Sequence, residues 1–93
     1  MAFDIAPEDL KARMDSGEKV QILDVREASE LAIASIGAIH IPLGQLPARY
    51  QELNPDQEIF VLCHHGVRAA NATVFLRSQG LNAINIRGGI DRW

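Results

Sequence analysis

The single thiol of the chain stands in a short segment whose residue types suit anion chemistry. Cys63 opens residues 63–68, with the sequence CHHGVR, directly after the apolar run Ile59–Leu62 and before a helical pattern that begins at Val67. The unpaired N–H groups and the positive dipole end of a helix N-terminus stabilise a thiolate. Gly66 lets successive N–H groups turn inward and form an anion-binding nest. We therefore expect a nucleophilic thiolate beside an anion-binding loop.

Arg68 lies in the first turn of the predicted helix, and residues 67–79 contain no acidic residue. A cation at that end of a helix opposes the dipole and costs about 0.3–1 kcal/mol, unless an anion lies between the two. We expect Arg68 to bind such an anion and to help keep Cys63 ionised. The alternatives are a buried, inert thiol, since free cysteines are among the most buried residues, and a surface arginine.

Length and composition narrow the class of protein. The 93 residues favour one domain, residues 1–93, with a single core. The formal charge of −3 argues against nucleic acid, no apolar stretch approaches the ~20 residues of a membrane span, and no signal peptide is recognisable at the start. One cysteine excludes an internal disulfide and a zinc site with two thiolates from one chain. We expect a cytoplasmic protein that needs no cofactor.

Strand and helix patterns alternate along the chain, which predicts an α/β domain with a mainly parallel sheet. The continuous apolar run at 59–62 is typical of a central strand buried on both faces. Ligands bind beyond the carboxyl ends of such strands, where residues 63–68 are expected. The predicted strands are 3–5, 20–25, 38–41, 59–62 and 83–86, and the predicted helices are 7–16, 27–33, 47–53 and 67–79.

The helix predicted over 67–79 has two adjacent apolar rows. One row consists of Val67, Ala70 and Val74, and the other of Ala69, Ala72 and Leu76. The small alanines allow the helix to pack closely on a sheet. Gly80 is expected to end the helix.

The pattern Cys-x-x-Gly-x-Arg after an apolar strand resembles the active-site loop of the rhodanese (thiosulfate sulfurtransferase) family. Residues 23–27 (LDVRE), 37–42 (GAIHIP) and 88–93 (GGIDRW) resemble further segments of that family, in the same order. The resemblance implies a rhodanese-like three-layer domain, with a mainly parallel central sheet of about five short strands flanked by helices. One departure is Ala69, where the family commonly has Ser or Thr after the arginine.

The resemblance implies a sulfurtransferase of the thiosulfate type. A small anionic donor such as thiosulfate, or a persulfide donor, transfers its outer sulfur to Cys63, and the resulting persulfide passes it to a thiol, a protein acceptor or, in vitro, cyanide. The implied catalytic residues are Cys63 and Arg68, and the implied substrate-binding residues are His64, His65, Gly66 and Val67. Four residues separate Cys63 from Arg68, whereas related phosphatase loops have five, which favours sulfur over phosphate.

The same resemblance allows a second class of function. A carrier or interaction module accepts sulfur and delivers it to a biosynthetic partner, with little turnover on thiosulfate. A purely structural rhodanese-like domain is a third reading, but such domains usually lack the cysteine that this chain has at position 63.

The roles of two histidines stay open at this point. The side chains of His64 and His65 either supply charge or a proton relay at the mouth of the pocket, or only their backbone N–H groups matter. A metal site that combines them with Cys63 and the distant His40 is disfavoured, because neighbouring side chains project apart and the thiol would be consumed.

Polar residues at other strand ends have alternative roles as well. Asp24 and Arg26 either tune the pocket from a second layer or form a structural pair that holds neighbouring loops. Arg87 either lines the approach to the site or is simply solvated, and Trp93 is expected to be a core or rim aromatic residue.

Overall fold

A five-stranded sheet in which every pair of neighbours is parallel forms the centre of the molecule, with the strand order β1-β5-β4-β2-β3. The computed structural model describes residues 3–18, 20–27, 38–63 and 67–89. The parallel α/β sheet expected from the alternating pattern is confirmed. Its strands are β1 (Asp4–Ile5), β2 (Gln21–Asp24), β3 (Ile39–His40), β4 (Ile59–Leu62) and β5 (Ala83–Ile86).

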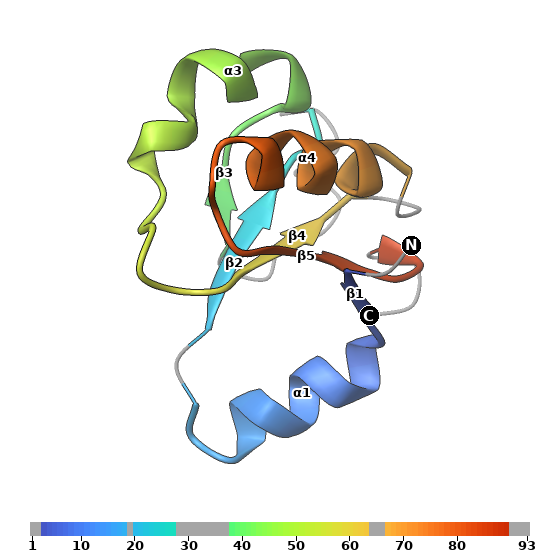
Figure 1. Ribbon diagram of the computed structural model, residues 1–93. Helices are drawn as coiled ribbons and strands as arrows, with labels where there is room; N and C mark the ends of the chain where they lie inside the picture. The colour runs from blue at the N-terminus through green and yellow to red at the C-terminus, as the bar shows by residue number, and fades with distance from the viewer. Residues whose placement is uncertain (1–2, 19, 28–37, 64–66, 90–93) are drawn as a thin grey trace.

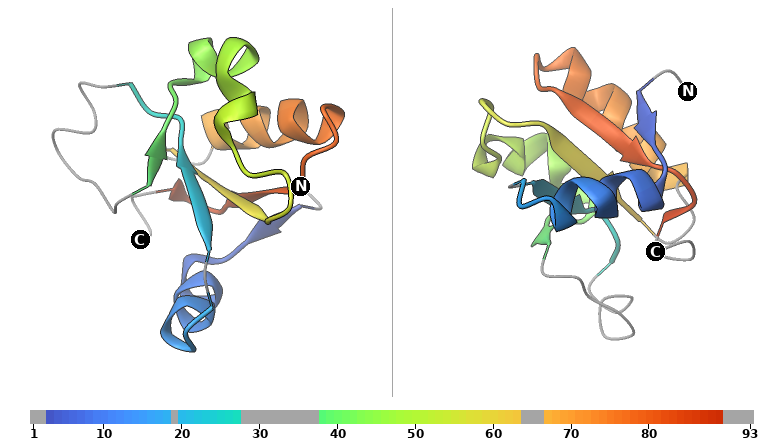
Figure 2. Two further views of the ribbon diagram at one scale, coloured as in Figure 1. Left: turned by 90° about the vertical axis from the view of Figure 1, so that its left-hand side faces the viewer. Right: turned by 90° about the horizontal axis from the view of Figure 1, so that it is seen from below.

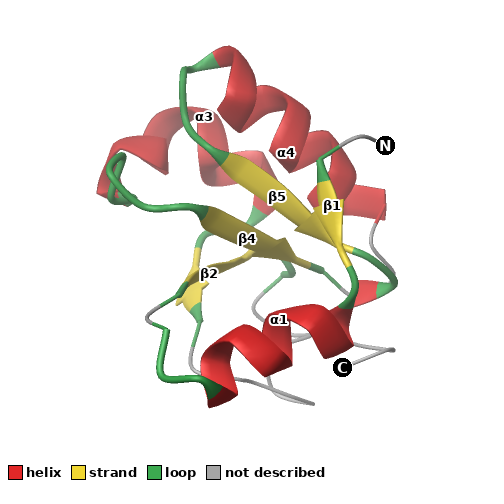
Figure 3. Ribbon diagram, turned by 60° about the horizontal axis from the view of Figure 1, so that its bottom comes forward, coloured by secondary structure: helices red, strands yellow, loops and turns green. Residues whose placement is uncertain are grey.

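Helices cover both faces of the sheet. The helix α1 (Pro7–Asp15) lies on one face, and α3 (Leu46–Arg49) and α4 (Val67–Ser78) lie on the other (Figure 1). The perpendicular views give the same arrangement of layers (Figure 2). Figure 3 shows the strands between the two helical layers. Two 3₁₀ turns, Leu43–Gln45 and Tyr50–Glu52, flank α3.

The core consists of two clusters of buried side chains, because successive residues of a strand point to opposite faces. All four residues of β2 and all four of β4 are buried, as the apolar run at 59–62 predicts. The cluster on the α1 face contains Leu10, Ile22, Phe60, Leu62 and Ile86. The cluster on the α4 face includes Leu23, Val25, Val61, Cys63, Ala69, Ala72 and Leu76.

The two apolar rows of α4 have different surroundings. Ala69, Ala72 and Leu76 are fully buried, which confirms that the alanines allow close packing on the sheet. The other apolar row instead faces solvent, since Val67 and Val74 are 69% and 62% exposed. A helix on a flat sheet buries only about one side, and the alanine row already occupies it. Gly80 follows the helix with φ 84°, the left-handed conformation expected for a helix end.

The segment between β3 and β4 is more broken than predicted. A single helix over 47–53 was expected, but the chain makes three short turns over 43–52, of which only Leu46–Arg49 is α-helical. Pro47 lacks a backbone N–H, so the bond that would join the first turn to the second cannot form. The predicted helix 27–33 falls, apart from the non-helical Glu27, outside the described residues.

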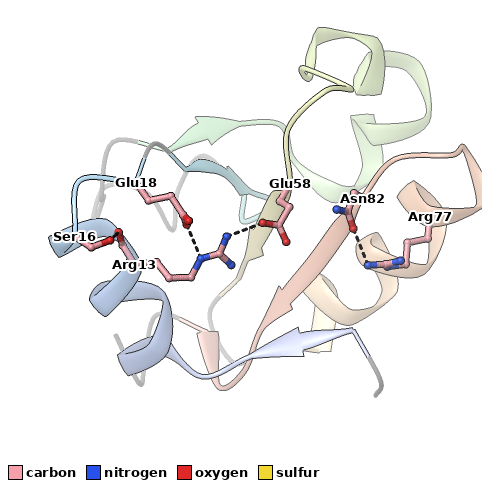
Figure 4. A network of polar contacts seen from close by, with 6 residues as sticks. All are labelled: Arg13, Ser16, Glu18, Glu58, Arg77 and Asn82. Carbon is pink, nitrogen blue, oxygen red and sulfur yellow. Dashed lines mark hydrogen bonds and ion pairs between the residues drawn. The ribbon is translucent and has the colours of Figure 1, made fainter.

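Polar contacts hold the amino-terminal end of the sheet, opposite the end where Cys63 lies (Figure 4). Arg13 of α1 pairs with Glu58, which precedes β4, at 2.6 Å, and also with Glu18. The Arg13 guanidinium lies 5.0 Å from the centroid of the Phe60 ring. These contacts fasten the end of α1 to the central strand.

The buried contact of α1 with the sheet gives a prediction about stability. Leu10→Ala is expected to lower the free energy of unfolding by about 2–5 kcal/mol, because Leu10 is fully buried in the α1-face cluster. Met14→Ala, one turn further along α1 and 37% exposed, is the control and should change it by less than about 1 kcal/mol. Urea denaturation measures both. Equal effects of the two substitutions would contradict the packing described for α1.

Candidate active site

Cys63 follows the central strand of the sheet, at its carboxyl end. The chain after β2 runs beside it, since the Val25 N–H donates to the Leu62 carbonyl oxygen at 3.0 Å. The Cys63 residue is only 1% exposed and belongs to the cluster on the α4 face, together with Val25 and Ala69. The side chain therefore points to the side of the sheet on which α4 begins.

The sulfur of Cys63 accepts a hydrogen bond from the first turn of α4. The distance from the Ala69 backbone nitrogen to Sγ is 3.3 Å. Ala69 is the third residue of the helix, and its N–H is one of those that have no partner within the helix itself. The N–H lies at the N-terminus of the helix, where backbone N–H groups without a partner in the helix are free to bind another acceptor.

Ala69 contacts the sulfur of Cys63, although the sequence pointed to this residue only for the hydroxyl that it lacks. A signal was present, because a helix that begins at Val67 leaves the N–H of its third residue unpaired. In this chain the contact to sulfur comes from the backbone and needs no side chain at position 69.

The other predicted loop residues fall into two groups. Arg68, half-buried, and Val67, 69% exposed, are the first two residues of α4. They lie in the same turn as Ala69 and hence at the same end of the sheet as Cys63. His64, His65 and Gly66 lie outside the described residues, so their predicted part in binding substrate stays a prediction.

Asp24 and Arg26 form a buried ion pair after β2. Both side chains are 2% exposed, and the Arg26 guanidinium donates to both carboxylate oxygens of Asp24 at 2.8–3.1 Å. The Arg26 backbone N–H also donates to Asp24 Oδ1 at 2.9 Å. Asp24 is in register with Leu62, whose side chain packs on the α1 face, whereas Cys63 faces α4. The Asp24 side chain therefore leaves the strand on the face of the sheet opposite to the Cys63 sulfur.

Further hydrogen bonds tie this ion pair to β3. Ile41 donates its N–H to the Asp24 carbonyl at 3.1 Å, and His40 Nε2 lies 2.7 Å from the Arg26 carbonyl oxygen. Because a carbonyl oxygen only accepts, His40 Nε2 carries the hydrogen. This geometry is that of the structural pair considered from the sequence. A role of Asp24 and Arg26 in tuning the pocket stays a prediction.

The remaining candidates are placed as follows. Arg87 comes directly after β5, is half exposed and pairs with Asp4 at 3.5 Å, while Trp93 lies outside the described residues. The part of the chain that the structure describes contains no group of three His, Cys, Asp or Glu side chains that could hold a metal ion. Across the same residues, no helix is long and apolar enough to cross a membrane.

Comparison with known proteins identifies the family. Residues 6–93 match the rhodanese-like domain, and the chain belongs to this family. A solved structure of a rhodanese-like domain protein from Staphylococcus aureus superposes with a TM-score of 0.93 at 32% identity, covering 98% of this chain and 90% of that one. The resemblance noted in the sequence and the rhodanese-like α/β fold are therefore confirmed.

Two curated relatives carry names that concern sulfur. A candidate sulfur carrier protein of Bacillus subtilis, YrkF, is 41% identical over 92 residues, which is 97% of this chain and 50% of that protein. A sulfurtransferase of Allochromatium vinosum is 33% identical over 95 residues, covering 100% of this chain and 89% of that protein. The chain thus spans half of one relative and most of the other. Its relatives include proteins named for sulfur transfer and for sulfur carriage.

The buried ion pair gives a second prediction. Asp24→Asn is expected to lower the free energy of unfolding by about 3–5 kcal/mol, because it leaves the Arg26 charge buried without its counter-ion. Asp24→Leu combined with Arg26→Met removes both charges and should recover much of that loss. The control, Glu52→Gln, breaks the exposed ion pair with Arg49 and should leave the free energy of unfolding nearly unchanged. Urea denaturation tests the set; a stable Asp24→Asn protein would contradict the role given to the pair.

Proposed function

We propose that this protein is a sulfurtransferase that carries sulfane sulfur as a persulfide on Cys63. The observation that carries the proposal is the hydrogen bond from the Ala69 N–H at the start of α4 to Cys63 Sγ. It is the arrangement that a nucleophilic thiolate needs, at the carboxyl end of the central strand of a rhodanese-like domain. The names of the relatives support sulfur as the transferred group.

In the first half-reaction the donor gives up its outer sulfur. The Cys63 thiolate attacks the outer sulfur of thiosulfate, the S–S bond of thiosulfate breaks, and sulfite leaves with the bonding electron pair. Arg68 and the N-terminus of α4 offset the negative charge of the donor and of the leaving sulfite. The product is a persulfide anion on Cys63.

In the second half-reaction an acceptor removes that sulfur. A thiolate, or cyanide in vitro, attacks the outer sulfur, the bond to Sγ breaks, and Cys63 leaves as a thiolate. The Ala69 N–H is then placed to donate to the leaving sulfur, as it does in the structure. Neither half-reaction needs an external oxidant or reductant, because each forms one bond to the transferred sulfur and breaks another. The covalent intermediate between the two steps predicts ping-pong kinetics. Because Cys63 is 1% exposed, the outer sulfur is the part of the persulfide that an acceptor reaches.

The second candidate is a sulfur carrier that hands its persulfide to a partner protein. It is favoured by the relative named as a candidate sulfur carrier, of which this chain matches half. The two candidates share the persulfide and differ in the acceptor. Turnover with thiosulfate and cyanide separates them, because a carrier forms a stoichiometric persulfide but loses it to cyanide only slowly.

Intact-mass spectrometry tests the persulfide directly. After incubation with thiosulfate, the protein is expected to gain the mass of one sulfur atom and to lose it again, as thiocyanate, on addition of cyanide. Cys63→Ser should take up no sulfur and form no thiocyanate, while its circular dichroism stays that of the folded protein. Sulfur uptake by the Cys63→Ser protein would contradict the mechanism.

Arg68 is tested by its effect on the anionic donor. Arg68→Ala is expected to raise KM for thiosulfate about 10-fold or more, since a hydrogen bond to a charged group contributes about 1.5–3 kcal/mol. Arg68→Lys should keep part of the effect, because it keeps the charge but loses the planar fork of donors. Arg49→Ala, an exposed arginine paired with Glu52 on α3, is the control and should leave KM unchanged. An unchanged KM in Arg68→Ala would remove Arg68 from the site.

A further inference from the structure

β5 lies beside the strand that ends at the nucleophile, and successive residues of a strand point to opposite faces of the sheet (Figure 3). Ala83 packs on the α4 face together with Cys63, whereas Ile86 packs on the α1 face. The strand geometry extends to Arg87, whose backbone N–H donates to the Ile5 carbonyl oxygen at 2.9 Å. The alternation therefore directs the Arg87 side chain to the same face of the sheet as Cys63.

The register of β4 and β5 places Arg87 level with Cys63. Val61 is paired with Asn85, and each chain continues from there by two residues, to Cys63 in one strand and to Arg87 in the other. The backbones of neighbouring strands are about 4.8 Å apart, and an extended arginine side chain is longer than that gap. Arg87 is thus within reach of an anion bound at the sulfur, on the side of Cys63 away from β2.

The Arg87 guanidinium is exposed and weakly paired. The side chain is 49% exposed, and its partner among the described residues is Asp4 of β1, with 3.5 Å between Nε and Oδ1. That distance exceeds the roughly 3.2 Å limit of an ordinary N–H···O hydrogen bond, and an exposed pair of this kind contributes little to stability. Gly88 and Gly89 follow with φ of 74° and 59°, so the chain turns directly after Arg87.

We propose that Arg87 selects anionic sulfur donors, because its guanidinium turns from Asp4 to the oxyanion of a donor bound at Cys63, while Asp4 competes with the donor for it. The inference rests on the proposed function and names the class of donor. That class is a small molecule with a charged sulfonate group on the transferred sulfur, as in thiosulfate. Arg68 belongs to the start of α4 and Arg87 follows β5, so two different elements hold the donor.

The sulfur transfer itself needs no additional reactant. The Cys63 thiolate forms a bond to the outer sulfur, the S–S bond of the donor breaks, and sulfite leaves with the bonding electron pair. Arg87 donates to the sulfonate oxygens of the donor and then to those of the leaving sulfite, for which the planar guanidinium is well shaped. A neutral donor offers no such oxygens, so Arg87 gives it no advantage.

The Asp4–Arg87 pair allows a test that depends on the sign of an effect. Asp4→Asn and Arg87→Ala both break the pair, so a purely structural role of the pair predicts that both variants change the site in the same direction. The proposed role predicts opposite directions, because Asp4→Asn releases the guanidinium whereas Arg87→Ala removes it.

Alkylation of Cys63 tests the charge preference without any sulfur transfer. Rate constants are measured by intact mass with iodoacetate, an anion, and with iodoacetamide, its neutral analogue. Their ratio cancels changes in the reactivity of the thiol itself. Arg87→Ala should lower the ratio of iodoacetate to iodoacetamide rate constants about threefold, and Asp4→Asn should raise it about twofold. Arg87→Lys should keep most of the ratio, because it keeps the charge.

The control variants change the net charge by the same amounts away from Cys63. Arg49→Ala and Glu52→Gln break the exposed pair in the segment between β3 and β4, and both should leave the ratio unchanged. Salt at about 0.5 M should reduce the effects of Arg87→Ala and Asp4→Asn, because it screens the charges.

The kinetic arm measures turnover with thiosulfate and saturating cyanide. Arg87→Ala should lower kcat/KM for thiosulfate about threefold, and Asp4→Asn should raise it about twofold. Circular dichroism checks that each variant has the fold of the unaltered protein.

The outcomes for the two proposals are separable. Shifts of the same sign in Asp4→Asn and Arg87→Ala, an unchanged ratio in Arg87→Ala, or a Cys63 that neither reagent modifies would overturn the role of Arg87. A protein that takes up no sulfur from thiosulfate, but whose alkylation ratio shifts as expected, would overturn the proposed function and leave Arg87 as a residue that selects anions.

Discussion

The hydrogen bond between the Ala69 N–H and Cys63 Sγ joins the two elements on which the candidate site depends, the end of β4 and the start of α4. It requires the helix to lie close to the sheet. Ala69 and Ala72 make this possible, because their small side chains are fully buried beneath the helix. Larger residues there would lift α4 and move its N-terminus away from the sulfur. The packing of an apolar core and the chemistry of the thiol are thus set by the same contact.

The two faces of the sheet have different tasks. The sulfur of Cys63 and the N-terminus of α4 lie on one face of the sheet. Asp24 points to the other face, and its ion pair with Arg26 fixes the chain directly after β2 next to His40 of β3. Contacts of Arg13 secure the far end of the central strand. Rigid support on both sides of β4 is what a nucleophile needs if its position is to stay fixed while a donor and then an acceptor arrive.

The sequence predicted the strands and the parallel sheet well, because short apolar runs alternate with a helical period. It also placed Cys63 at the junction of β4 and α4, since strand ends and helix starts have clear signals. It failed for the chain around Pro47, where local turns replace one helix, and it left open which apolar row of α4 is buried. Which of two adjacent apolar rows is buried depends on the position of the sheet, and that position is a property of the tertiary structure.

The strands at the two margins of the sheet, β1 and β3, contain only two residues each. A neighbouring polypeptide that tried to extend the sheet would find almost no backbone with which to pair. Short edge strands disfavour growth of a sheet by strand addition and the aggregation that follows from it. A domain with such short edge strands is suited to a place beside other folded domains, because it offers their sheets little backbone to join.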